Sequence, residues 1–202
     1  MNSTVEEKKT WKYESDRVLL CPYIPGSAMF APDILARLWA MMERDKLMAT
    51  VFPGMGEMTF NRFISYMSQV PLLIGLVKPM RGAPETLKCD IAGFAFLYGV
   101  EGSGDYRKAM CAFAFTRPNW RMAEIRQLTR LGLRWWFEEL GIAVLFGTIL
   151  ASNGIALSYA KKMGFTKVAR VPNFFCRPDG FDDAYLVTLT RERFNITIGG
   201  GR

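Results

Sequence analysis

The sequence predicts a single α/β domain built on a mixed β-sheet. Residues 91–100 and 109–116 have the pattern of two long apolar strands, and the linker EGSGDYRK between them suits a hairpin, which indicates antiparallel pairing. After residue 109, segments with strand spacing alternate with segments of helical spacing, which indicates that part of the sheet is parallel. The length of 202 residues, half of them hydrophobic, is typical of one domain with a substantial core.

Composition predicts that the two ends differ from the domain. Residues 1–16 are polar and charged, which predicts an N-terminal arm, and residues 195–202 contain a run of three glycines, which predicts a short tail. The domain itself is expected to cover residues 17–194.

The first half of the domain is predicted to contain a strand, two helices and a second strand. The first strand covers residues 17–24 and is broken at Pro22. Pro32 opens a helix whose apolar side chains recur at helical spacing, and Thr59 is placed to cap a second helix that runs to Met67. A loop at residues 52–56 separates the helices, and a strand at residues 72–78 follows them.

The second half adds the two hairpin strands and two strand–helix pairs. Residues 123–140 form the longest helical pattern, and residues 142–150 form a strand. Ser152 and Asn153 are good caps for a helix that ends at Gly164. Strands at residues 166–171 and 184–190 complete the order β, α, α, β, β, β, α, β, α, β, β.

Several function classes are excluded or disfavoured by composition. The chain has no histidine, so imidazole bases and Ser–His or Cys–His nucleophile pairs are excluded. Its four cysteines are scattered without a Cys-x-x-Cys pair, which indicates a reducing cytoplasm and predicts no metal site. No apolar run reaches the roughly 20 residues of a membrane span, and the charged N-terminus has no secretion signal. The net charge of +7 permits an acidic partner such as nucleic acid.

One stretch resembles a known family. Asn153, Ala156, Gly164 and Phe165 match the Asn-x-x-Ala…Gly-Phe pattern of the GCN5-related N-acetyltransferases, the GNAT superfamily. The segment RVPNFFCRPDGFDDAYLVTL is similar to the last strands of the ribosomal-protein N-terminal-alanine acetyltransferases. The resemblance covers about residues 88–192 and implies the GNAT fold, with acetyl-CoA as the cofactor of an active member.

The resemblance also places a cofactor loop at the start of the long helix. In GNAT enzymes this loop reads Gln/Arg-x-x-Gly-x-Gly/Ala, and its backbone N–H groups hold the pyrophosphate. Arg121 falls on the first position, whereas Glu124 and Arg126 replace the two glycines. A carboxylate at about 4 Å from a phosphate charge costs about 4 kcal/mol at an effective dielectric of about 20. We therefore expect no cofactor. If acetyl-CoA does bind, the resemblance implies contacts with Phe115, Arg117, Arg121, Ile125 and Asn153.

The acid and base positions implied by the resemblance are altered too. Ala160 occupies the position of the tyrosine that acts as general acid in the relatives, and Tyr159, about 100° away around the helix, is expected to point elsewhere. Thr148 occupies the position of the glutamate that acts as general base. The remaining candidates for catalysis are Glu101, Glu124 and Tyr159.

Four further features each have a structural and a functional interpretation. Arg126, Arg130 and Arg134 form a column at helical spacing that is either a solvated face, braced by Glu138, or a phosphate-binding surface. Trp120 either fills an empty cofactor notch or stacks on a ring. Trp135 and Trp136 are expected in the core. The three aspartates of the last hairpin fit a turn better than a cation site; they are Asp179, Asp182 and Asp183.

Two hypotheses of function follow. The first is a non-catalytic GNAT-fold protein that acts through a protein partner or assembly; degenerate chains of this kind resemble phage proteins, so the location would be the host cytoplasm or a virion. The alternative is a divergent acetyl-CoA-dependent N-acyltransferase acting on a protein or a small amine. Its acceptor would lie between residues 50–58 and the hairpin loop at residues 172–183. Binding to nucleic acid through the arginine column is a third, weaker idea, and no membrane partner is expected.

Overall fold

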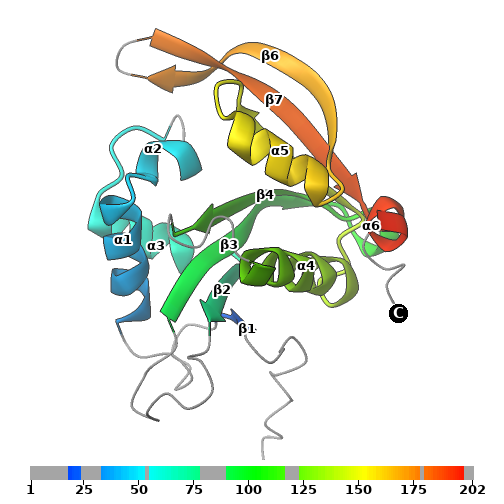
Figure 1. The fold of residues 1–202 in the computed structure, drawn as a ribbon, viewed down its shortest axis with the longest axis horizontal. Helices are drawn as coiled ribbons and strands as arrows, with labels where there is room; N and C mark the ends of the chain where they lie inside the picture. The colour runs from blue at the N-terminus through cyan, green and yellow to red at the C-terminus, as the bar shows by residue number, and fades with distance from the viewer. Residues whose placement is uncertain are drawn as a thin grey trace, which may run out of the picture.

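The computed structural model describes residues 18–23, 33–52, 55–77, 90–116, 123–177 and 180–197. These residues form one seven-stranded sheet with helices on both faces (Figure 1). The strands are β1 Val18–Pro22, β2 Leu72–Val77, β3 Asp90–Glu101, β4 Lys108–Phe115, β5 Val144–Leu150, β6 Thr166–Arg177 and β7 Gly180–Thr190. The α-helices are α1 Ile34–Arg44, α2 Met48–Val51, α3 Phe60–Met67, α4 Ala123–Glu138, α5 Gly154–Lys162 and α6 Arg191–Thr197.

The sheet is mixed, as the sequence predicts. Its strand order is β1-β2-β3-β4-β5-β7-β6, and only the β4–β5 pair is parallel. The predicted hairpin of β3 and β4 is antiparallel, with Gly93 opposite Phe115 and Tyr98 opposite Met110. A short 3-10 helix at Gly104–Tyr106 lies in the linker.

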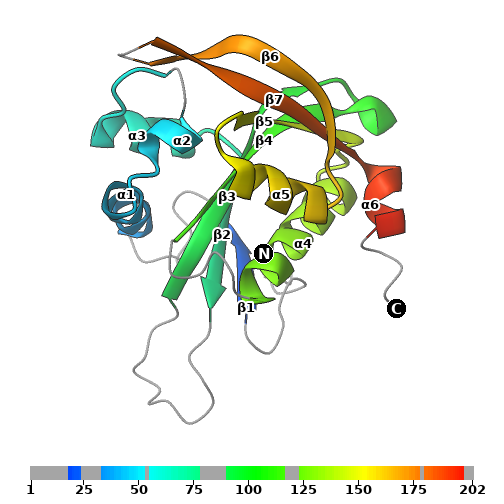
Figure 2. The same ribbon diagram turned by 45° about the horizontal axis from the view of Figure 1, so that its top comes forward.

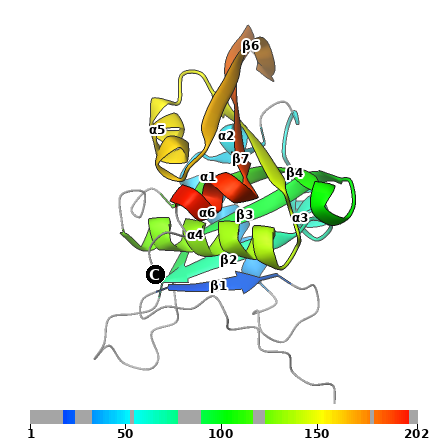
Figure 3. The same cartoon turned by 90° about the vertical axis from the view of Figure 1, so that its right-hand side faces the viewer.

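Two hydrophobic clusters lie on opposite faces of the sheet. Because side chains alternate along a strand, Phe113 of β4 packs in one cluster and Ala114 in the other. The first cluster is covered by α4 and α5, and the second by α1 and α3, as Figures 1 and 2 show. Helix α4 lies along β1 and β2, which Figure 3 shows from the side.

Core packing agrees with the helical patterns in the sequence. Trp136 is fully buried, and its ring lies 5.2 Å from that of Phe113, while Trp135 is half-buried against the same cluster. Both tryptophans therefore belong to the core, as predicted. On the other face, Phe63 and Phe94 pack edge to face at 6.4 Å between ring centres.

Helix caps explain why the helices begin where they do. The Thr59 hydroxyl accepts a hydrogen bond from the N–H of Arg62, and the Asn153 side chain accepts one of 3.0 Å from the N–H of Ala156. Both caps confirm the sequence prediction. Gly164, with φ of +89°, follows α5 and allows the turn into β6.

The last hairpin is longer than the sequence predicts, and the turn position predicted for Asp182 and Asp183 is wrong. Asp182 and Asp183 lie within β7, while Asp179 lies outside the described residues. The register shifts between Val171 and Phe175, where Asn173 adopts a positive φ of +52°. The Asp183 carboxylate accepts hydrogen bonds from Arg170 Nε and from the N–H of Asn173, both at 2.9 Å. The polar residues thus stabilise a bulge rather than a turn.

The predicted domain limits fall partly outside the described residues. The arm at residues 1–16 lies outside them, and the boundary predicted between residues 194 and 195 falls inside α6. Helices α2 and α6 were not predicted, because α2 is only four residues long and α6 follows the last strand directly. Among the described helices, none is long and apolar enough to cross a bilayer.

Candidate functional site

The candidate site begins where two parallel strands separate. Strands β4 and β5 pair only from Lys108 opposite Val144 to Met110 opposite Phe146. Beyond this point β4 continues along β3, whereas β5 continues along β7 as far as Leu150. The two strands therefore diverge, and the backbone of β4 from Cys111 onward lies beside an opening instead of beside β5.

A cavity of about 310 Å³ occupies this opening. Phe113 and Tyr159 line it from the face covered by α4 and α5, and Ala112 and Val51 line it from the face covered by α1 and α3. Since its walls include members of both hydrophobic clusters, the cavity passes through the sheet at the split.

The α4–α5 side of the cavity is organised by Tyr159. Its hydroxyl lies 2.6 Å from Thr129 Oγ1 and donates to the carbonyl of Ile125 at 3.3 Å, which ties α5 to the first turns of α4. Its ring packs edge to face against Phe115 at 6.0 Å. Burial raises the pKa of Tyr159 to about 12, so the phenol keeps its proton at neutral pH.

The opposite side of the cavity carries a second phenol and a carboxylate. Tyr98 of β3 forms a side-chain hydrogen bond with Thr148 of β5, and burial raises its pKa to about 12. Asp45 follows α1, is 5% exposed, and accepts hydrogen bonds from Arg44 Nε at 2.9 Å and from Arg44 Nη2 at 3.2 Å. Lys46 and Thr50 lie beside Asp45 in the cavity wall.

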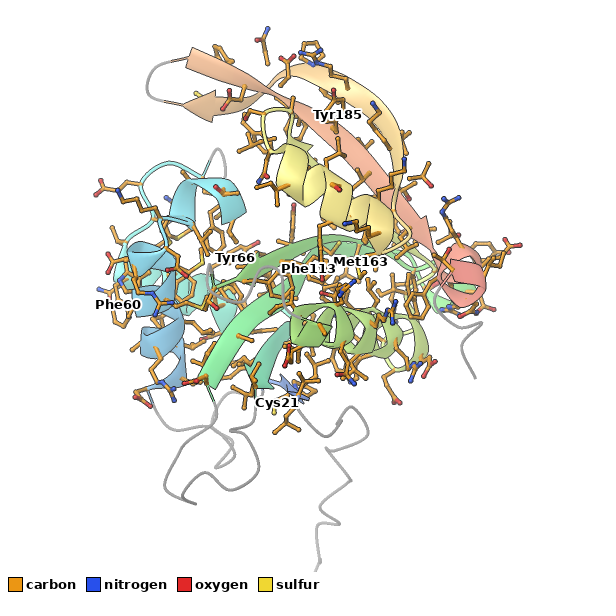
Figure 4. All side chains as sticks on the ribbon, viewed as in Figure 1. Cys21, Phe60, Tyr66, Phe113, Met163 and Tyr185 are labelled. Carbon is orange, nitrogen blue, oxygen red and sulfur yellow. The ribbon has the colours of Figure 1, made fainter. Side chains whose placement is uncertain are left out.

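Between these two sides the cavity reaches deeply buried apolar residues. Met163, Phe165 and Val187 line it, and each is at most 6% exposed. Figure 4 shows Phe113 and Met163 in the space between α4 and α5. Cys111 lines the same region, and burial raises the pKa of its thiol to about 12.

Solved structures share this architecture. The spermidine N-acetyltransferase from Vibrio cholerae, determined with CoA and spermine, matches with a TM-score of 0.69 at 11% identity, over 89% of this chain and 99% of that chain. A GNAT-family acetyltransferase from Bacillus anthracis matches with a TM-score of 0.64 at 11% identity, over 89% and 98%. The ribosomal-protein-S5-alanine acetyltransferase from Vibrio fischeri matches with a TM-score of 0.66 at 8% identity, over 89% and 96%. The chain has the GNAT acetyltransferase fold.

The similarity to these solved GNAT structures shows the fold alone. No protein-family model matches the sequence, and no curated protein matches it either. The fold expected from Asn153, Ala156, Gly164 and Phe165 is confirmed by these solved structures. Asn153 caps α5, Ala156 lies in its first turn, and Gly164 and Phe165 connect it to β6.

Four of the predicted GNAT site residues meet at the cavity. Phe115, Ile125, Asn153 and Tyr159 all line it. Tyr159, expected to point away from the position of Ala160, lines the cavity with its hydroxyl directed towards α4, 2.6 Å from Thr129 Oγ1. Arg117, Trp120 and Arg121 lie outside the described residues.

The two glutamates proposed as catalytic candidates do not line this cavity. Glu101, at the end of β3, is exposed and forms an ion pair of 3.1 Å with Lys108. Glu124 is half-buried in the first turn of α4. Thr148 and Ala160, which stand at the positions of base and acid, do line the cavity.

Sequence reasoning missed Asp45 and Tyr98. These residues are distant in sequence from the β4–α5 segment that carries the GNAT pattern, and they reach the cavity only because α1 and β3 pack beside the split. A single aspartate at the end of a helix and a tyrosine in a strand carry no local signal of a site.

The arginine column of α4 is exposed, and one of its members pairs with Glu138. Arg126, Arg130 and Arg134 are exposed, and Arg134 Nε lies 3.8 Å from Glu138 Oε1, as the spacing predicts. Within the described part of the chain, no three cysteine or acidic side chains gather closely enough to hold a metal ion.

Proposed function

We propose that the chain is an N-acyltransferase that uses a CoA thioester as acyl donor. The observation that carries this proposal is the cavity that crosses the sheet at the β4–β5 split. A donor bound between α4 and α5 and an acceptor amine entering beside α2 would meet within it.

The cavity walls suit the arm of CoA. Beyond Met110, β4 presents backbone groups to the opening, and an extended amide chain can pair with such groups as a further strand would. Ile125 and Phe115 would pack against the arm, and Asn153 would stand near the start of α5. Glu124 and Arg126, whose charges led us to expect no cofactor, lie outside the cavity wall. When bound, the thioester would supply an activated acyl group.

The titratable groups in the cavity wall restrict which class of amine can be the acceptor. Transfer forms a C–N bond and breaks the C–S bond, while the amine loses a proton and the sulfur departs as thiolate or thiol. Tyr98 and Tyr159, with pKa values of about 12, can donate a proton at neutral pH but cannot accept one, and the Asp45 carboxylate is already held by Arg44. We therefore infer that the amine arrives neutral. An α-amino group, with an ordinary pKa of roughly 7.7–8.0, meets this condition far better than a lysine at about 10.4.

The acceptor would enter beside the turn between α1 and α2. Asp45, Lys46 and Thr50 line that side of the cavity. In Figures 1 and 2 the far end of the β6–β7 hairpin extends over the side of the molecule that carries α2. The acceptor position inferred from sequence, between residues 50–58 and the last hairpin, agrees with this route.

Isothermal titration with CoA and acetyl-CoA tests binding, and release of free thiol in the presence of a peptide with a free α-amino group tests transfer. Ala156→Trp fills the cavity from α5, whereas Ser158→Trp makes the same kind of change on the exposed face of that helix. We expect binding to weaken at least tenfold in the first variant and to stay unchanged in the second. Absence of heat at millimolar CoA would overturn the proposal.

A second candidate function is a non-catalytic protein that keeps the GNAT cavity without its chemistry. It is favoured by the residues at the acid and base positions, Ala160 and Thr148, neither of which can exchange a proton at neutral pH. Asp45, the carboxylate in the described wall, is already paired with Arg44. CoA binding without thiol release for any amine would support this candidate, as would a stable complex with a protein partner in size-exclusion chromatography with light scattering.

A further inference from the structure

We propose that Tyr98 donates the proton that acyl transfer delivers to the departing sulfur, and that Thr148 positions the Tyr98 hydroxyl for this step. The inference rests on the proposed function and assigns its proton donor. It is drawn from where Tyr98 lies relative to the gap between β4 and β5, and from where the proton of each phenol in the cavity wall is directed.

The first step is the position of the Tyr98 hydroxyl. Tyr98 lies opposite Met110 of β4, and Met110 lies opposite Phe146 in the last β4–β5 pair. Thr148 is two residues further along β5, so it lies on the same face of the sheet but beyond the end of that pairing. The hydrogen bond between Tyr98 and Thr148 therefore spans the opening between β4 and β5. Since both residues line the cavity, the hydroxyl lies at the split, where a thioester and an amine would meet.

The second step is the direction of the hydrogen bond between Tyr98 and Thr148. Burial raises the pKa of Tyr98 to about 12, whereas this hydrogen bond acts in the opposite direction. A hydrogen bond lowers the pKa of a phenol when it is donated to the phenolic oxygen, because it then stabilises the phenolate. Thr148 is thus the donor, and the phenolic proton of Tyr98 is left for a ligand in the cavity.

The third step is the proton of the other phenol, Tyr159. The Thr129 hydroxyl donates to the carbonyl of Ile125 at 2.9 Å, so Thr129 Oγ1 accepts in its 2.6 Å contact with the Tyr159 hydroxyl. The other printed contact of that hydroxyl within the described chain is the same Ile125 carbonyl, at 3.3 Å. The proton of Tyr159 is therefore directed into α4, where it ties the two helices together.

The fourth step is the chemistry that this arrangement allows. Tyr98 gives its phenolic proton to sulfur as the C–S bond breaks and the electron pair of that bond goes to sulfur. The phenolate that remains takes the proton that the amine nitrogen loses as the C–N bond forms. Tyr98 is thereby restored, and Thr148 stabilises the phenolate between the two proton transfers. No further reactant is needed.

A binding experiment tests the contact between Tyr98 and sulfur without turnover. Isothermal titration compares CoA with desulfo-CoA, which lacks the sulfur atom. We expect the protein to bind CoA about fivefold more tightly, as one hydrogen bond would give, and Tyr98→Phe to bind both equally. Tyr66→Phe is the matched control and should keep the preference. The rings of Tyr66 and Tyr98 each lie 5.9 Å from that of Phe96, but Tyr66 does not line the cavity.

A kinetic experiment tests the proton transfer, with acetyl-CoA and a peptide that has a free α-amino group. Tyr98→Phe should lower kcat about a hundredfold or more without raising KM for the peptide. Thr148→Val should lower kcat about tenfold, and Thr148→Ser, which keeps the hydroxyl, should restore it. Tyr66→Phe should leave kcat unchanged. A larger loss of kcat in Tyr159→Phe than in Tyr98→Phe would contradict the assignment.

The outcomes separate the two proposals. If the unchanged protein binds CoA and transfers the acyl group, but Tyr98→Phe keeps both the preference for CoA and most of kcat, the inference is wrong and the proposed function stands. If CoA does not bind to the unchanged protein, the proposed function fails and the inference fails with it. Circular dichroism of each variant distinguishes a loss of folding from a loss of the proton donor.

Discussion

Gly93→Ala should destabilise the sheet next to the cavity. A Cβ atom at residue 93 would overlap the carbonyl oxygen of Ala114, and it would lie 2.7 Å from Phe115 Cδ1 and 2.9 Å from Phe115 Cα. Two of these three atoms belong to the backbone of β4, so a side-chain rotation cannot relieve the overlap. Strands β3 and β4 would have to move apart.

The loss in the free energy of unfolding caused by Gly93→Ala can be estimated from the overlap and from the hydrogen bonds that would be weakened. Overpacking in a core typically costs 1–3 kcal/mol, and each weakened ladder hydrogen bond adds about 1 kcal/mol. We therefore expect a loss of about 3–4 kcal/mol, out of a total stability of roughly 5–15 kcal/mol. For a chain of this length that corresponds to a melting temperature lower by about 6–15 °C.

Urea and thermal unfolding followed by circular dichroism measure this loss. Gly154→Ala is the matched control, because a Cβ atom there would meet nothing within 4 Å and the residue begins α5. The control should be neutral or slightly stabilising, since alanine is the better helix former. A loss below 1 kcal/mol for Gly93→Ala would refute the close packing of β3 on β4. Because Ala114 and Phe115 line the cavity, CoA binding should weaken as well.

Three further predictions concern α5 and the buried thiol. Tyr159→Phe and Thr129→Val should each lower the free energy of unfolding by about 1 kcal/mol, and a double-mutant cycle should show that the two losses are coupled. Additive losses would mean that the 2.6 Å contact between the two hydroxyl groups contributes nothing to stability. The free energy of unfolding should fall as the pH rises from about 9 to about 12, because the pKa of Cys111 is about 12 in the fold but near 8.5 in the unfolded chain. Cys111→Ala should move the start of this loss of stability to higher pH, and an unchanged pH dependence in that variant would contradict the assignment to Cys111. Asn153→Ala should cost about 1 kcal/mol through loss of the cap on α5, whereas Asn153→Asp should restore most of it.

Local patterns were enough to locate most of the elements. Apolar spacing placed α4 and α5, and the caps at Thr59 and Asn153 fixed where two helices begin, because both signals depend on residues close together in the chain. The same reasoning failed at residues 171–177. There the predicted strand ends at residue 171, whereas Asp183 on the neighbouring strand stabilises a bulge and lets β6 continue.

The GNAT fold and part of the candidate site could likewise be inferred from the residues near Asn153 and from the family they resemble. The direction of Tyr159 could not, because the angle around a helix does not say what the helix packs against. The contribution of Asp45 and Tyr98 was also inaccessible, since each reaches the cavity from an element distant in sequence.

The sequence by itself determined the mixed sheet, the capped α5 and the absence of imidazole chemistry, all of which follow from residue type and local spacing. The tertiary structure alone decided that β5 pairs with β7 along its whole length but with β4 only as far as Phe146, which leaves the gap in the sheet. The physical reason is that strand pairing is settled between segments distant in sequence, and the two edges of β5 pair with different strands over different lengths. No local pattern records how far each pairing extends.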